Sequence, residues 1–208
     1  MFIPRHSVVE NQFCSYSEDN SFGSAGVGGV VAYAGSVVYL DPAATNEEPM
    51  VKKMAHGITE APFGFSMQKV KVGYHQVHPT GFVMPGDLGS SDAIAQALYD
   101  ASGNIVGHKS VPVGVAHLGI FDTVHYTCTK AAGVVQTKMA PGASLFAAAD
   151  QAKLTNSTTD SDGTDDEVNG DRCSSVVVAR VVKGASIAKC QANVDNVTLY
   201  PIRVKLLV

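Results

Sequence analysis

Short runs of β-branched and apolar residues, each ended by Gly, Pro or Asp, recur through most of this chain at roughly ten-residue spacing. The stretch 27–42 holds two such runs, which are separated by Gly35. Further along, apolar side chains alternate at Val111, Val113 and Val115, so they project from one face of a strand. Many short strands bounded by turn residues pack as a sandwich or a barrel. We therefore predict an all-β fold, a small barrel or sandwich of short strands with at most one or two short helices.

One segment also fits a helix. In 90–102, Ile94, Ala97 and Leu98 stand at i, i+3 and i+4, and Ser91 or Asp92 would cap the first turn. The same residues fit a strand that leads into a turn at 101–104 equally well. Strands and helices do not alternate along the chain, so a nucleotide-binding parallel sheet is not expected.

The domain organisation follows from changes in composition. Residues 1–25 are polar with scattered large apolar side chains and no helical period, which predicts an extended N-terminal arm. We expect a β-barrel domain over 26–208, with an insertion at about 73–104. The Ser-, Thr- and Asp-rich stretch at about 156–171 cannot bury enough apolar surface to become ordered, so it is expected to be a mobile acidic loop.

A degenerate repeat runs through the strand pattern. A glycine, a small residue, apolar residues and a closing Asp occur at 35–41 and again at 142–150. An alternating strand with small residues on one face follows each copy, at 62–67 and 175–180. Glycine permits a tight bend, and small side chains let strands approach closely in a narrow barrel. The order of these pieces repeats along the chain.

Charge and cysteine content exclude several classes of protein. The net charge is −4 without a Lys/Arg cluster, so a nucleic-acid partner is not expected. The chain has no apolar run long enough for a signal peptide or a membrane span, which predicts a protein made and kept in a cytoplasm. The four cysteines form no C-x-x-C pair, so we expect reduced, mostly buried thiols.

The histidines do not predict a catalytic or zinc site. His75 and His78 stand three apart, so on a strand they face opposite ways and cannot hold one metal. His117 and His125 lie in a strand-rich stretch, where a histidine is more often a hydrogen-bonded core or interface residue than a base. The chain has no G-x-S-x-G, H-E-x-x-H or phosphate-loop motif. We therefore predict that the protein is not an enzyme.

The acidic loop contains the most specific local motif. Asp160, Asp162 and Asp166, with Gly163 at the turn, match a D-x-D-G-x-x-D pattern that suits calcium. The bidentate glutamate at twelve-residue spacing is absent, and a solvated acidic loop has the same composition. We expect no cofactor, with calcium at these aspartates as the alternative.

Longer segments resemble a known family. The stretch 140–155, the strand run 176–184 and the terminal 204–208 resemble the small-barrel decoration (cement) proteins of tailed phages, and 33–41 with the strand at 62–66 resembles the opening of the same pattern. The resemblance covers roughly 26–72 and 105–208. The chain departs from the family at Ser144, where an acidic residue is common, and at Gln151–Ala152, which replace a turn glycine.

This resemblance implies a function. It implies a structural virion protein on the capsid surface, made in the host cytoplasm, which stabilises the expanded shell by bridging subunits of the major capsid protein. It also implies a homo-oligomer, a trimer or alternatively a dimer. We expect the arm to add a strand to a sheet edge of the shell, with capsid contacts from Phe2, Ile3, Val8, Val9 and Phe13. The alternative is a tail or spike component that binds a host surface ligand.

Overall fold

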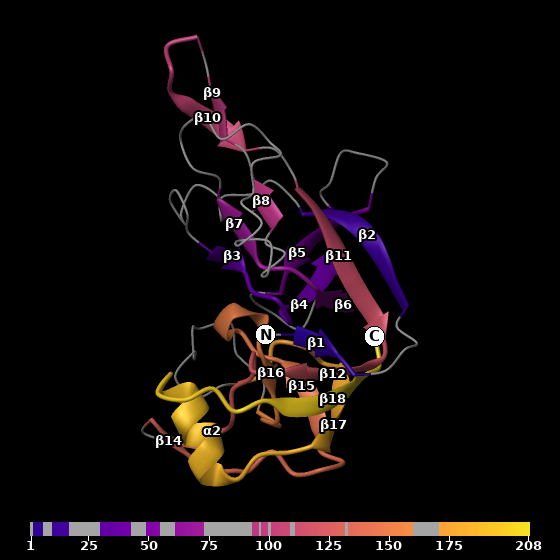
Figure 1. Cartoon of the computed structure of the whole chain (residues 1–208), viewed down its shortest axis with the longest axis vertical. Helices are drawn as coiled ribbons and strands as arrows, with labels where there is room; N and C mark the ends of the chain where they lie inside the picture. Colours follow the sequence, from indigo (N-terminus) through magenta and orange to yellow (C-terminus); the bar gives the residue numbers. More distant parts are fainter. Residues whose placement is uncertain are drawn as a thin grey trace.

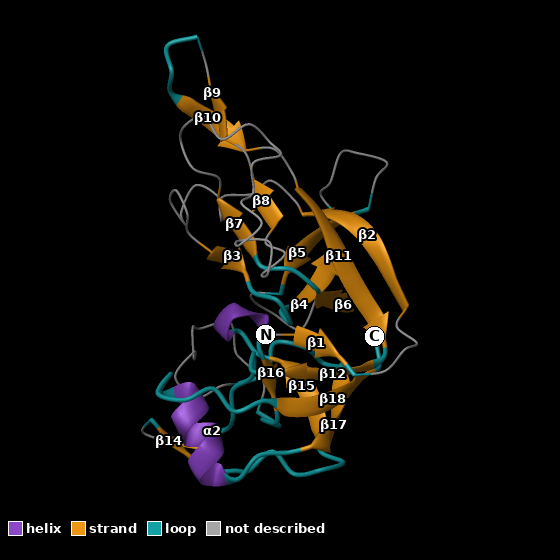
Figure 2. Cartoon of the chain, in the orientation of Figure 1, coloured by secondary structure: helices purple, strands orange, loops and turns teal. Residues whose placement is uncertain are grey.

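The strand pattern correctly predicts the fold class: the chain is all-β in the parts that the structure describes (Figures 1 and 2). This computed structural model describes residues 2–5, 10–16, 30–42, 49–54, 61–72, 93–95, 97–99, 101–108, 111–131, 133–159 and 171–208. Most of the strands belong to two bodies, which we call the N-terminal barrel and the C-terminal unit. In Figure 1 the N-terminal barrel lies above the C-terminal unit.

The N-terminal barrel is closed by five strands. They are β2 (Glu10–Tyr16), β4 (Val37–Leu40), β5 (Met50–Lys53), β6 (Pro62–Ser66) and β11 (Val111–Leu118). Around the barrel the order is β11-β2-β5-β4-β6, and only the β2–β5 pair is parallel. Its core contains inward-facing apolar side chains, among them Tyr16, Val38, Val51, Val113 and Val115.

The C-terminal unit uses the second half of the chain. Its strands are β12 (Ile120–Thr123), β15 (Ser144–Ala147), β16 (Leu154–Thr155), β17 (Ala179–Lys183) and β18 (Ile202–Leu206). They pair in the order β12-β18-β17-β15-β16, and a single parallel bridge from Tyr126 to Leu154 joins the ends of this sheet. β1 (Phe2–Pro4) occupies the remaining edge of β12.

The two bodies repeat one arrangement of five strands. β4 lies between β5 and β6, as β15 lies between β16 and β17. β11 joins β6 to β2, as β18 joins β17 to β12. Each body also contains one parallel pairing, which joins Tyr16 to Val51 in the N-terminal barrel and Tyr126 to Leu154 in the C-terminal unit. The chain is therefore a tandem structural repeat.

The glycine turns of the sequence repeat occupy equivalent positions in the two bodies. Gly35 and Gly142 have φ of 97° and 83°, a region that favours glycine. The Gly35 amide donates to the Ser66 carbonyl at 2.7 Å, and the Gly142 amide donates to the Val181 carbonyl at 2.7 Å. Each turn leads directly into the middle strand, β4 or β15. The repeat in the sequence thus marks the start of the same strand twice.

The two bodies share a hydrophobic core. Val37, Phe65 and Ala116 of the N-terminal barrel belong to the same buried cluster as Phe121, Leu145 and the other core residues of the C-terminal unit. Phe2 completes this joint, because its ring stacks on Phe121 at 4.3 Å and on Phe65 at 5.9 Å between centroids. Stacked rings at these distances add to the free energy gained from burial. The joint is apolar and continuous with both cores.

The predicted N-terminal arm over 1–25 is described only in part. The structure describes residues 2–5 and 10–16 of that range, and both segments pair with strands of the same chain. β2 is an integral strand of the N-terminal barrel, which could not close without it. Sequence reasoning did not identify β2 as a strand, because it lacks a clean apolar alternation and only its partners show its place in the barrel.

Other elements extend the N-terminal barrel. β3 (Val30–Ala32), β7 (Val70–Val72) and β8 (Ala93–Ala95) form a small sheet, and β9 (Ala97–Tyr99) pairs with β10 (Ile105–His108) in a hairpin at the far end of the molecule (Figure 1). The predicted insertion at 73–104 falls in this connection between β6 and β11, and its bounds stay a prediction. The helix considered at 90–102 is wrong, and the strand alternative holds for β8 and β9.

A helix occurs instead in the C-terminal unit. Among the described residues the α-helix is α2 (Ile187–Val194), in the connection between β17 and β18 (Figure 2). The Ser186 side chain caps it by accepting from the Lys189 amide. Cys190 and Asn193, three apart, are its buried positions. The 3-10 helix η2 (Asp150–Ala152) is the second short helix. The hairpin of β13 (Lys130–Ala131) and β14 (Val134–Val135) packs beside α2.

Candidate functional site

The structure describes three of the five residues predicted to contact a capsid. The Phe2 ring is stacked within the joint, so it is not available to a partner. Ile3 is on β1 and is 37% exposed. Phe13 lies in β2, where its backbone pairs with Gly114. Val8 and Val9 lie outside the described residues. That these five residues share one capsid contact stays a prediction.

The predicted calcium aspartates, Asp160, Asp162 and Asp166, also lie outside the described residues. At the ends of their loop, the Ser157 hydroxyl donates to a buried carboxylate, Asp171 Oδ1, at 3.4 Å. Among the residues that the structure does describe, no three His, Cys, Asp or Glu side chains converge to hold a metal. Calcium binding in the loop remains a prediction.

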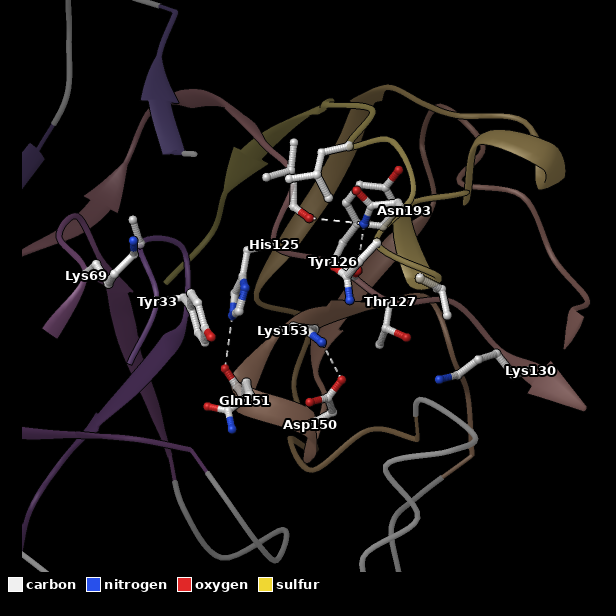
Figure 3. Close-up of a pocket in the computed structure, with 15 residues that line it drawn as sticks. Tyr33, Lys69, His125, Tyr126, Thr127, Lys130, Asp150, Gln151, Lys153 and Asn193 are labelled. Carbon is white, nitrogen blue, oxygen red and sulfur yellow. Dashed lines mark hydrogen bonds and ion pairs between the residues drawn. The ribbon is translucent and has the colours of Figure 1, made fainter. Parts of the chain in front are cut away.

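A cavity of about 370 Å³ opens where the N-terminal barrel meets the C-terminal unit (Figure 3). Tyr33 and Lys69 line it from the N-terminal side. The opposite wall is formed by residues that follow β12, by η2 and by the end of α2. Three lysines face it, Lys69, Lys130 and Lys153, and the last of these pairs with Asp150. The cavity is thus polar, with an excess of positive charge.

One hydrogen-bonded group spans the wall of this cavity and joins the two bodies. His125 Nε2 lies 3.0 Å from Ser36 Oγ and 3.0 Å from the Gln151 carbonyl oxygen. The Ser36 hydroxyl donates to the same carbonyl at 2.9 Å and accepts from the Tyr33 amide at 3.1 Å. Tyr33 covers the imidazole, with ring centroids 5.3 Å apart. A turn of the first body is therefore bonded to two segments of the second.

The His125 ring is neutral in this setting. Its burial lowers the pKa from the ordinary 6.5 to about 4, because a charged imidazole would lose its hydration. The hydrogen-bond partners then favour the tautomer with a proton on Nε2, which donates to the Gln151 carbonyl. Ser36 already donates its own proton to that carbonyl, and its side chain is fully buried. The pair is consequently a buried structural link between the two bodies.

The backbone of η2 is strained where it meets this link. Gln151 and Ala152 have φ of 55° and 51°, the left-handed region that residues with a Cβ rarely adopt. These are the two residues that replace a turn glycine in the family resemblance. The Gln151 side chain is held by Lys53 of β5, whose Nζ donates to Oε1 at 2.9 Å. Contacts from the N-terminal barrel thus hold an unfavourable turn of the C-terminal unit.

Sequence reasoning found part of this group. His125 was predicted to be a hydrogen-bonded core or interface residue, and its burial and bonds confirm that. Ser36 and Gln151 were missed as its partners, because they lie 89 and 26 residues from His125 in the chain and 115 residues from each other. The departure from glycine at Gln151 was the one signal in the sequence that pointed to this turn.

Four exposed apolar side chains lie on α2, on β14 or in the loop after α2. We call this set the α2 flank and define it by Val134, Ile187, Val197 and Leu199, which are 57%, 46%, 77% and 53% exposed. The flank is held in place by Gln191, which accepts from the Val135 amide at 2.7 Å and donates to the Gly133 carbonyl at 3.3 Å. Leu199 also lines the cavity. Exposed apolar side chains on an ordered surface are typical of contact sites.

No protein-family model matches this chain, and no curated protein matches it. Within the described part of the chain, no helix has the length and apolar character needed to cross a membrane.

Proposed function

We propose that the chain is a structural virion protein that binds the outer surface of a phage capsid and stabilises the expanded shell by bridging subunits of the major capsid protein. The observation that carries the proposal is the joint between the two bodies. Phe2, Phe65 and Phe121 stack across it, and both bodies contribute to one buried cluster. A bridging protein needs such a joint, because a flexible one would let the bridged subunits move apart.

The α2 flank replaces the arm as the proposed capsid contact. Phe2 and β1 are already bound within the chain, so a strand added from the arm to the shell would have to leave its own sheet. The flank instead presents apolar side chains to solvent, and ordering Ile187 and Val134 on binding costs little because they already lie in α2 and β14. Aliphatic contacts suit a shell surface that is exposed only after expansion.

The physical basis of stabilisation is mass action. A protein that binds the expanded shell and not its precursor shifts the equilibrium toward the expanded form. Oligomers of the chain would hold several flanks at once, so weak contacts add through effective concentration. A trimer, or alternatively a dimer, remains part of this proposal and follows from the family resemblance.

Cosedimentation with shells tests the proposal. Expanded and unexpanded capsids of the phage that encodes the chain, assembled without it, are incubated with the full-length protein and pelleted. We expect the protein in the pellet of expanded shells only. The variant carrying Val197→Asp and Leu199→Asp should bind at least about tenfold more weakly, because two flank side chains become charged.

Leu40→Asp is the matched control, since Leu40 is 44% exposed but lies on β4 of the N-terminal barrel. Circular dichroism of each variant checks that the fold is kept. Wild-type protein that stays in the supernatant with expanded shells contradicts the function. Wild-type binding that both variants retain contradicts the assignment of the flank.

A tail or spike component that binds a host surface ligand is the second candidate. The cavity at the joint favours it, because Lys69 and Lys130 face a space that suits a small anionic group. Adsorption of labelled protein to host cells tests this candidate. Binding that is lost in Lys69→Ala and kept in Leu40→Asp would support it over the capsid proposal.

A further inference from the structure

One face of the sheet in the C-terminal unit gathers positive charge. β1, β12, β18 and β17 lie side by side in this sheet (Figure 1). Residues that pair directly across antiparallel strands project from the same face. Two rows of such pairs cross the sheet: Ile120, Lys205 and Arg180 form one, and Ile3, Asp122, Arg203 and Lys183 form the other. Arg203 and Lys205 stand two apart on β18, so both rows lie on one face, and it is the outer face because Val204 between them is completely buried.

The cations of these rows form a cluster that is not visible in the sequence. We call them, together with Arg5, the cationic face, and its members are Arg5, Arg180, Lys183, Arg203 and Lys205. Arg5 belongs to it because its Nε lies 2.7 Å from Asp122 Oδ2. Arg203 is half-buried, and the other four cations are exposed. Their positions in the chain run from 5 to 205, so only strand pairing brings them together.

The charge of the cationic face is opposite to the charge of the chain. Asp122 is the one acidic residue in the two rows, so the five cations and this carboxylate carry a net charge of +4. The whole chain carries −4, which leaves −8 for the rest of it. Exposed charges are screened beyond about 8 Å at physiological salt, so a surface that touches the cationic face meets the local positive charge.

This arrangement lowers the stability of the isolated chain. Arg180 is directly opposite Lys205, and Lys183 is directly opposite Arg203. Like charges that face each other across two strands are destabilising. Asp122 offsets the repulsion at Arg203, whose Nε donates to Oδ1 at 2.8 Å, whereas Arg180 and Lys205 lie in the other row. Features that break a local rule in this way are expected at surfaces with a function, where the partner supplies the missing opposite charge.

We propose that the cationic face binds an acidic protein surface, one on which several Asp and Glu side chains lie close together. The inference does not rest on the proposed capsid function. Arg203 and Lys205 are about 7 Å apart along β18, so they can each engage a separate carboxylate. Asp122 orients the guanidinium groups of Arg5 and Arg203, whose remaining N–H groups suit the two oxygens of a carboxylate.

The surroundings of the cations favour a protein over a nucleic acid. Ile3 and Ile120 stand in the same two rows, and the exposed Val182 precedes Lys183 on β17. Aliphatic side chains gain free energy when a protein surface covers them, whereas a phosphate backbone offers them no apolar contact. A nucleic-acid strand longer than the face would also run over the rest of the chain, which is negatively charged. A cluster of carboxylates on a protein is confined to the face itself.

Fluorescence anisotropy with a labelled decaglutamate peptide and the full-length protein tests the inference. We expect saturable binding at about 50 mM salt that is at least about tenfold weaker at about 300 mM, because exposed charges are screened. The variant carrying Lys183→Glu and Lys205→Glu should bind at least about tenfold more weakly than the wild type. Its fold should be kept, because each new glutamate is opposite an arginine, and its thermal midpoint should rise by about 2 °C.

The variant carrying Lys138→Glu and Lys189→Glu is the matched control. It changes the net charge equally at two exposed lysines outside the two rows, so it should bind the peptide within about twofold of the wild type. Wild-type protein that does not bind the peptide, or a control that loses as much binding as the first variant, overturns the inference. A labelled ten-nucleotide single-stranded DNA and vesicles that contain phosphatidylserine are measured in parallel. Tighter binding of either one than of the peptide, lost with Lys183 and Lys205, overturns the assignment to a protein partner.

Discussion

At the scale of single residues, His125 connects the two bodies without carrying charge. Its ring touches Ser36 from the first body and the Gln151 carbonyl from the second, and Tyr33 shields it from solvent. A buried polar link of this kind restricts how the two bodies can pack, because each donor needs its acceptor. The link also makes the stability of the protein depend on pH.

We predict that stability falls as the pH is lowered from about 6.5 toward 4. The pKa of His125 in the folded state is about 4 against 6.5 ordinarily, so in this window the unfolded chain binds a proton that the folded chain does not. The stabilisation that comes from the lowered pKa of His125 is fully present above pH 6.5. Its loss at low pH lowers the free energy of unfolding by about 3 kcal/mol. Urea unfolding at a series of pH values measures it.

His125→Gln is the comparison for this prediction, because glutamine keeps an N–H donor and does not titrate. The difference in unfolding free energy between wild type and variant should shrink as the pH falls. Asp122 does not interfere, since the hydrogen bond from Arg203, with that from Arg5, holds its pKa below 3.8. A difference that is constant with pH would show that the pKa of His125 is the same in the folded and the unfolded chain.

At the scale of elements, the repeat supplies a matched pair of turns. Gly35 and Gly142 share their place before β4 and β15 and their positive φ. A Cβ on Gly142 meets nothing within 4 Å, whereas a Cβ on Gly35 would lie 3.1 Å from Thr123 Oγ1 and 3.2 Å from a Phe2 ring carbon. The two turns therefore share a backbone conformation, but only Gly35 has side chains packed close to it.

We therefore predict that Gly142→Ala costs about 1 kcal/mol of stability, which is the backbone strain alone. Gly35→Ala should cost about 1–2 kcal/mol more, because the new methyl group also crowds the joint. Chemical unfolding of both variants beside the wild type measures the difference. Equal losses would mean that Thr123 and Phe2 move aside freely.

The strand β1 supports a prediction of its own. Phe2→Ala should destabilise the protein by about 2 kcal/mol, because it removes a half-buried ring that stacks on Phe121. Ile3→Ala, on the same strand but 37% exposed, should change stability by less than about 1 kcal/mol. Thermal unfolding checks both. An unchanged midpoint in Phe2→Ala would restore the view of residues 1–25 as a separate arm.

At the scale of the whole molecule, the two bodies form one cooperative structure. Their interior is a shared cluster, and the chain passes from the N-terminal barrel to the C-terminal unit at Gly119, between β11 and β12. We predict a single calorimetric transition whose van't Hoff and calorimetric enthalpies agree. Two separate transitions would show that the joint contributes little, and would also weaken the case for a bridging protein.

Local chemistry alone determined the fold class, both glycine turns and the buried character of His125, because alternation, turn residues and side-chain polarity act over a few neighbours. The helix at 187–194 escaped that reasoning, since eight residues carry too few turns of apolar periodicity to stand out beside strands.

Tertiary structure decided the rest. Phe2 belongs to the joint and not to an arm only because Phe65 and Phe121 come together around it. Ser36, His125 and Gln151 form one group only after both bodies have folded. These residues are far apart along the chain, so no local pattern specifies their contacts. The free energy gained by burying these residues together specifies their contacts instead.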